Sequence, residues 1–133
     1  MYGAVSPEDG ELFSLVMPYA NTDCMNVFLE ELSKAYPDDY ILLLLDNAAW
    51  HRSSTMVVPS HIELFPLLPY TPELNPIEMI WDEVREKGFR NEIFKNLEAV
   101  IDRLCCTVKE LAVDVQRVTS ITHRRWLINA LMI

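Results

Sequence analysis

The stretch YILLLLDNAAWH, residues 40–51, decides the fold of this chain. Five consecutive apolar residues, 41–45, are followed at once by an acid, an amide and, five positions after the acid, a histidine. Because the apolar run does not alternate with polar residues, it predicts a strand covered on both faces, as central strands of α/β sheets are. Such a strand would hold Asp46 at the carboxyl end of the sheet, where open α/β sheets bind their ligands.

The segments before this strand predict a hairpin and a helix. Residues 2–5 and 11–17 are short strand-like runs, and the Asp-Gly pair between them is a strong hairpin-turn signal. From Asn21 or Thr22, either a good N-cap, to Tyr36, apolar residues recur with the helical period. A crossover helix followed by a buried strand predicts a sheet that is at least partly parallel.

The segments after this strand predict a second strand and then helices. Residues 53–60 predict a short helix, and residues 61–69 predict a strand in which a proline marks an edge or an end. The chain is expected to be one domain, residues 1–133, with an α/β core over 1–90 and C-terminal helices over 91–133. Three apolar faces at helical spacing support these helices: Ile77, Ile80, Trp81 and Val84; Leu97, Val100, Ile101, Leu104, Val108, Leu111 and Val115; and residues 121–131.

The composition is that of a soluble globular domain. Half of the 133 residues are hydrophobic, yet no apolar window approaches the ~18 to 20 residues that cross a bilayer. The N-terminus lacks the pattern of a secretory signal, so a cytoplasmic protein is expected. The three cysteines, of which Cys105 and Cys106 are adjacent, suit neither a disulfide framework nor spaced zinc ligands, and we interpret them as reduced thiols that mainly fill the core.

The net charge of −9 limits how this chain could bind nucleic acid. A domain that holds DNA by its own surface field is normally basic, because neutralisation of phosphates supplies most of the non-specific affinity. The one compact basic patch is HRRW, residues 123–126. Its Arg124 and Arg125 could contact DNA or a partner, or could lie on a solvated helix face.

Two acidic residues follow segments that can bring them to the same edge of the predicted sheet. Asp46 ends the buried strand, although it could instead cap the next segment or start a turn. Glu78 is the third residue of a predicted helix that opens with an Asn-Pro pair, which is also the pattern of a capping box. Glu78 lies about 60° around the helix from Trp81, so it borders the face that packs on the sheet.

Two carboxylates from separate elements are suitable ligands for a magnesium-type ion. Mg²⁺ takes oxygen ligands and is usually held by one or two carboxylates together with substrate phosphates. In phosphoryl transfer, two such ions activate the attacking oxygen and stabilise the leaving one. A third carboxylate normally completes the site, but Asp9 falls in the hairpin turn and Asp23 in the first turn of a helix, where structural roles are expected.

Three further polar residues are candidates for the surroundings of this site. Asn47 and His51 follow Asp46 closely, although a histidine after a strand is often a packed or surface residue. Arg85 lies two turns along the helix from Glu78 and could meet a phosphate, but pairing with nearby acids on the surface is the simpler expectation.

The combination of LLLLDNAAWH, residues 42–51, with LLPYTPELNPIEMIW, residues 67–81, resembles the DDE superfamily endonuclease domain of transposases. The most similar group is the mariner-type superfamily, including its bacterial insertion-sequence members, and the resemblance covers roughly residues 1–90. It implies a ribonuclease-H-like fold, with a mixed sheet flanked by helices. It also implies an integrase-like chemistry of DNA transposition, in which three acids bind Mg²⁺ or Mn²⁺ and DNA is cut and rejoined at transposon ends.

The resemblance also implies roles for individual residues. Asp46 would be the second acid of the family and Glu78 the third, so both would be catalytic metal ligands. Asn47 and His51 match the amide and the histidine that follow the second acid, and Trp81 matches the tryptophan of the helix.

The sequence departs from the family pattern in three ways. Arg85 stands where a lysine is common, and the 31 residues between positions 46 and 78 are slightly fewer than usual. The strand that carries the first acid, and the DNA-binding region before it, are not present. The resemblance therefore implies a domain truncated at its N-terminus, which binds metal weakly and is inactive alone. A homodimer, or assembly with another transposase chain in the nucleoid, could restore activity.

Two other classes of function remain open. A non-catalytic transposase remnant could act as a dimerisation or interaction module, and the missing first acid favours this alternative for the isolated chain. A different Mg²⁺-dependent phosphoryl-transfer enzyme would normally show a glycine-rich phosphate loop, and three glycines in the whole chain leave little room for one.

Overall fold

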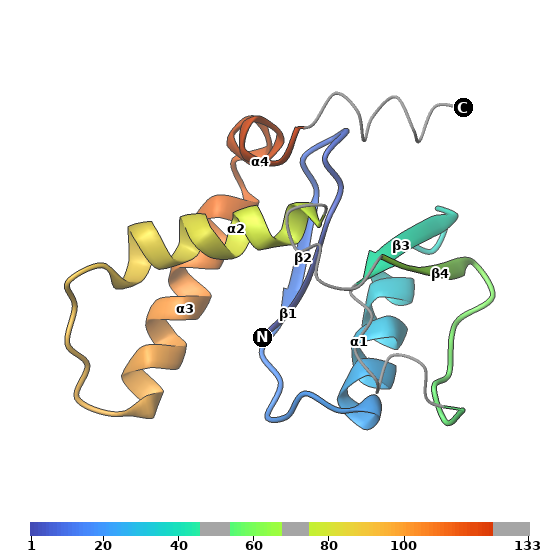
Figure 1. Ribbon diagram of the computed structural model, residues 1–133, viewed down its shortest axis with the longest axis horizontal. Helices are drawn as coiled ribbons and strands as arrows, with labels where there is room; N and C mark the ends of the chain where they lie inside the picture. The colour runs from blue at the N-terminus through green and yellow to red at the C-terminus, as the bar shows by residue number, and fades with distance from the viewer. Residues whose placement is uncertain (46–53, 68–74, 124–133) are drawn as a thin grey trace. The chain divides into compact units, whose positions relative to one another are not determined.

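The computed structural model describes residues 1–45, 54–67 and 75–123, and these form an α/β structure (Figure 1). The α/β class predicted from the sequence is therefore confirmed. The chain divides into two compact units, one made of residues 1–2 and 17–75 and the other of residues 3–16 and 76–133. The described residues contain two sheets of two strands each.

A parallel strand pair organises the first unit. Strand β3 (Ile41–Leu45) pairs with β4 (Ile62–Pro66), in a register that sets Ile41 beside Ile62 and Leu45 beside Pro66. Backbone hydrogen bonds extend the pair at both ends, from Ile41 N to His61 O and from Leu67 N to Leu45 O, each at 2.8 Å. The parallel pairing confirms the expectation drawn from the helix and apolar strand that precede it.

Helix α1 (Thr22–Ala35) supplies most of the buried side chains of this unit. It starts where the sequence predicts, because the Asn21 side chain accepts a hydrogen bond from Cys24 N at 2.9 Å. Its buried face is Cys24, Met25, Phe28, Leu29 and Leu32, which lie with Leu45 and Ile62 of the strands in the core.

The strand pair is covered on one face only within the described residues of its unit. Because side chains alternate along a strand, Leu45 and Ile62 share one face, and both are buried. The other face carries Leu42 and Phe65, which are 44% and 54% exposed. Within this unit α1 is the single described helix and covers one side, so the prediction of a strand covered on both faces is confirmed for that side and stays a prediction for the other.

The predicted helix over residues 53–60 is also wrong for the residues that the structure describes, 54–60. This segment makes a turn at 54–55 and then runs without helical structure to Pro59. The β-branched residues Val57 and Val58 disfavour a helix, and the side chain of Asn26 on α1 binds the backbone of this segment instead.

A β-hairpin begins the second unit. Strands β1 (Tyr2–Val5), whose first residue belongs to the other unit, and β2 (Leu12–Leu15) pair with each other. The predicted Asp-Gly turn is confirmed: Gly10 N donates to Ser6 O at 2.8 Å, and Gly10 has a φ of 76°. A side chain at Gly10 would also meet the carbonyl oxygen of Val115, so both the turn and this close approach require glycine.

Four helical elements complete the second unit: α2 (Pro76–Val84), a π-helical turn η3 (Arg85–Phe89), α3 (Leu97–Ala112) and α4 (Val115–Thr122). Their apolar faces pack together, as the sequence predicts for α2. The buried side chains are Leu12 of the hairpin, Ile77, Ile80 and Val84 of α2, Val108 and Leu111 of α3, and Val118 and Thr122 of α4.

The predicted apolar face from Leu97 to Val115 is divided between two helices. Helix α3 ends at Ala112, and the side chain of Asp114 accepts from Arg117 N at 3.1 Å to begin α4. Asp114 interrupts the periodic pattern because its side chain satisfies an amide at a new helix start. Of the helix predicted over residues 121–131, positions 124–131 lie outside the described residues.

The described chain bears on two expectations from the composition, one about the cysteines and one about membrane-spanning segments. Its three cysteines are free thiols, but Cys24 alone is buried, while Cys106 is exposed. The described helices are all too short or too polar to span a bilayer.

Close packing of a glycine fixes α2 against the hairpin. Gly3 of β1 lies so near Trp81 of α2 that an added Cβ would come within 2.6 Å of the indole ring. The neighbouring Ile77 side chain lines the same contact. The position of α2, and hence of any residue that it carries, depends on the absence of a side chain at position 3.

We expect the N-cap of α3 to contribute measurably to stability. Asn96 accepts a hydrogen bond from Ala99 N at 2.9 Å on an exposed helix end. Asn96→Ala should lower the free energy of unfolding by about 1 kcal/mol in urea titrations, whereas Asn96→Asp should keep the acceptor and the stability. Equal losses in both variants would show that this cap is not the cause.

We also expect Gly3→Ala to destabilise the protein by about 1–3 kcal/mol, because the new methyl group overpacks the contact with Trp81. In a Trp81→Phe background the indole atoms that clash are gone, so the same substitution should cost much less. Urea titrations of the four proteins form a double-mutant cycle. Additive effects would contradict the proposed contact.

Candidate metal and DNA site

The strand that leads to Asp46 is held firmly up to its last residue. Leu45 is 7% exposed, and its carbonyl oxygen accepts a hydrogen bond from Leu67 N on the β4 side. Asp46 follows directly in the sequence but lies, with Asn47 and His51, outside the described residues. Because β3 ends at Leu45, Asp46 follows the carboxyl end of a strand in the sequence, as predicted. Its role as a metal ligand stays a prediction.

Glu78 lies in the first turn of α2, as the sequence predicts. Its side chain is half-buried, and no hydrogen bond or ion pair joins its carboxylate to the described residues around it. The bond from Glu78 to the backbone of Asn75 that defines a capping box is therefore not formed within this part of the chain. The carboxylate retains its oxygen atoms for another ligand.

Three contacts within the second unit fix the helix that carries Glu78. Ile80 is completely buried, and Trp81 packs over Gly3. An ion pair between Glu83 and Arg117 links α2 to α4, and both side chains are partly shielded from solvent. A carboxylate on such a helix is held in a defined position, as a metal ligand requires.

Arg85 makes a surface ion pair, as its position among nearby acids predicts. Its guanidinium donates to Asp82 one turn earlier, and both side chains are well exposed. A phosphate would have to compete with Asp82 for this group. Arg124 and Arg125, the predicted DNA contacts, lie outside the described residues.

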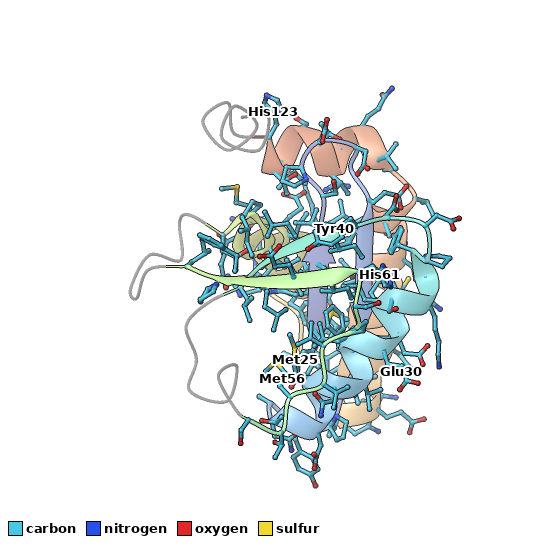
Figure 2. The ribbon with its side chains drawn as sticks, turned by 90° about the vertical axis from the view of Figure 1, so that its right-hand side faces the viewer. Met25, Glu30, Tyr40, Met56, His61 and His123 are labelled. Carbon is cyan, nitrogen blue, oxygen red and sulfur yellow. The ribbon has the colours of Figure 1, made fainter. Side chains whose placement is uncertain are left out.

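Sequence reasoning missed the side chain that anchors the segment leading to β4. Asn26 of α1 donates from Nδ2 to Thr55 O at 3.1 Å and accepts from Val57 N at 2.8 Å, so it pairs with this backbone as a neighbouring strand would. Met25 and Met56, next to these residues, are labelled in Figure 2. An asparagine within a helix is unusual enough to suggest a side-chain role, but its partner cannot be deduced from the sequence.

A second link that the sequence did not reveal ties the start of β4 to α1. His61 Nδ1 lies 2.7 Å from the carbonyl oxygen of Asp39, and Nε2 lies 2.6 Å from Ser33 Oγ. A carbonyl can only accept, so Nδ1 carries a hydrogen and donates it to Asp39, while Nε2 and the Ser33 hydroxyl form the second hydrogen bond. This arrangement explains His61 as a structural residue, and it lies with Tyr40 at one end of the strand pair (Figure 2).

Tyr40 forms a further bond across the strand pair. Its hydroxyl donates to a carboxylate oxygen of Glu63 at 3.0 Å, and this hydrogen bond raises the pKa of Tyr40. Both groups are on the surface. The pair therefore orients side chains at the amino end of the strands, away from the end that leads to Asp46.

The described residues supply part of a metal site. No group of three or more potential metal ligands occurs among them. Of the two predicted acids, Glu78 alone is described, and its unengaged carboxylate is the hard oxygen donor that Mg²⁺ and Mn²⁺ take. Among the described residues, Glu78 is therefore the one predicted ligand whose chemistry can be compared with such an ion, and it fits.

Comparison with known proteins identifies the family. Residues 1–101 match the DDE superfamily endonuclease family. An uncharacterized protein, y4pE/y4sA, from Sinorhizobium fredii (strain NBRC 101917 / NGR234) is 35% identical over 127 residues, which cover 95% of this chain and 94% of that protein. No solved structure matches significantly. The match over three-quarters of the sequence shows that this chain belongs to the DDE superfamily endonuclease family.

Proposed function

We propose that this chain is part of a transposase catalytic domain of ribonuclease-H-like fold, which cleaves and joins DNA strands with Mg²⁺ or Mn²⁺. The observation that carries the proposal is the half-buried Glu78 carboxylate, which has no structural partner among the described residues, in a chain of the DDE superfamily endonuclease family. The order of hairpin, crossover helix, strand before Asp46 and helix with Glu78 also agrees with such a fold.

Asp46 and Glu78 are the metal ligands in this proposal. An ion held between them would supply the charge that polarises the scissile phosphate and lowers the pKa of the attacking hydroxyl group. Asn47 and His51 would lie beside the ion and orient the phosphate or a water molecule. Arg85 could leave Asp82 for a phosphate, because an exposed ion pair contributes little to stability and exchanges at small cost.

Asp46 and Glu78 would be two of the three acids that this chemistry uses. Metal binding by these two acids alone should be weak. DNA affinity would also depend on assembly with other chains. The net charge of −9 opposes binding to phosphates, and two arginines, Arg124 and Arg125, are too few to offset it.

An interaction module is the second candidate, and one observation favours it. Among the described residues β3 pairs with β4 alone, so an apolar strand has an unpaired edge. A chain of this kind could assemble with other transposase subunits without cutting DNA. This alternative predicts assembly without metal binding.

Calorimetric titration with Mn²⁺ tests the catalytic proposal. We expect the wild type to give a weak binding signal, and Asp46→Ala or Glu78→Ala to abolish it, because each removes one of two ligands. Asp102→Ala is the matched control, since it removes an exposed acid of α3 and changes the net charge equally. Identical titrations of the wild type and Asp46→Ala would contradict the proposed site.

The paramagnetism of Mn²⁺ provides a test of geometry. In NMR spectra, the ion should broaden the amide signals of both Leu45 and Glu78, because they precede and carry the two ligands. Broadening at Glu78 without Leu45 would show that the two acids do not share an ion. For the calorimetric titrations, an unchanged circular dichroism spectrum of each variant would show that its loss of Mn²⁺ binding is not caused by unfolding.

A further inference from the structure

The arginines of the described chain are engaged by acids of the chain itself. A guanidinium group is well suited to hold a DNA phosphate, because its planar fork of N–H donors matches the phosphate oxygens. DNA would therefore have to compete with internal carboxylates for these groups. The four ion pairs in residues 1–45, 54–67 and 75–123 that involve arginine are Arg85 with Asp82, Arg90 with Glu86, Arg103 with Glu92 and Arg117 with Glu83.

Two of these arginines have structural roles that oppose such an exchange. Arg117 joins α4 to Glu83 of α2, and the Glu83 side chain is mostly shielded from solvent. Arg103 of α3 also donates to Gly88 O at 3.3 Å, and its guanidinium lies 5.9 Å from the centre of the Phe94 ring. Moving either arginine to a phosphate would break contacts between helical elements.

The pair of Asp82 with Arg85 differs because it is local and exposed. Its two residues are three positions apart, and their side chains are 71% and 65% exposed. Exposed pairs of this kind contribute little to stability. A phosphate could therefore take the place of the Asp82 carboxylate without disturbing the packing of α2.

Helical geometry places this pair on the same side of α2 as Glu78. With 3.6 residues in each turn, Asp82 lies about 40° from Glu78 around the helix axis, and Arg85 lies about 20° from it in the other direction. Arg85 is also about 10 Å from Glu78 along the axis, because each residue rises about 1.5 Å. A DNA strand with one phosphate at a metal ion on Glu78 would bring neighbouring phosphates close to Arg85.

We propose that Asp82 is an internal competitor of DNA, whose carboxylate occupies Arg85 in the free protein and gives way to a phosphate of the bound strand. A phosphate that approaches Arg85 is repelled by the Asp82 carboxylate as well as excluded by its ion pair. A strand held by further contacts overcomes this competition, because it presents its phosphate at a high effective concentration. Asp82 thus disfavours isolated phosphates and favours an extended strand. The inference rests on the proposed function, because it takes the partner to be DNA.

Fluorescence anisotropy of a labelled single-stranded oligonucleotide, titrated with the full chain at low salt, tests this inference. Asp82→Asn removes the competing charge and should tighten binding about two- to threefold, in line with the small strength of an exposed ion pair. In an Arg85→Gln background the same substitution should have a much smaller effect, because no guanidinium is left to release. Equal effects in the two backgrounds, no effect of Asp82→Asn, or no binding by any of these proteins would overturn the proposal.

Glu86→Gln is the matched control for the loss of a negative charge. It removes the exposed partner of Arg90, which follows the helical turn that Arg85 begins. This variant should change the affinity less than Asp82→Asn does, and an equal gain would show that net charge rather than Arg85 decides the result. The titrations contain a chelator and no divalent ion, so they can fail while the Mn²⁺ titrations succeed, and the reverse also holds.

Discussion

The parallel pairing of β3 with β4 is the constraint on which the rest of the first unit depends. Two parallel strands need a long connection between them, and their pairing does not bury enough apolar surface to be stable alone. Helix α1 supplies that surface through Phe28, Leu29 and Leu32. Its polar side chains then fix the connection, through Asn26 at one point and the Ser33–His61 bond at another. One helix therefore provides both the core and the alignment of the strand that precedes Asp46.

Elements whose start or turn is fixed by neighbouring residues could be predicted from the sequence. The cap at Asn21, the Asp-Gly turn and the Asn-Pro helix start each rest on residues close in the chain, and the structure confirms the elements that they predict. Predictions failed where distant residues decide. The segment 54–60 is held by Asn26, about thirty positions away, which competes with any tendency to form a helix. Similarly, periodicity extended α3 to Val115, although Asp114 caps a new helix there.

The candidate site shows the same division between local and long-range information. The place of Glu78 in the first turn of α2 followed from the Asn-Pro pattern. The absence of a capping bond to its carboxylate within the described chain could not be predicted, because the same residues suit a capping box equally well. The packing of Trp81 over Gly3 was likewise invisible in the sequence, since the tryptophan pattern indicates a buried face but not its partner. That the carboxylates of Asp46 and Glu78 lie close enough to share a metal ion stays a prediction.

The order in which the chain builds its two units has a consequence for folding. Residues 1–2 belong to the first unit, residues 3–16 to the second, and the chain then returns to each in turn. The Tyr2 hydroxyl reaches the backbone of Tyr19 and Asn21, so even the first residues close a loop within the first unit. No single cut can separate the units intact. Because many contacts join distant parts of the sequence, the protein should have a high contact order and fold slowly for its size.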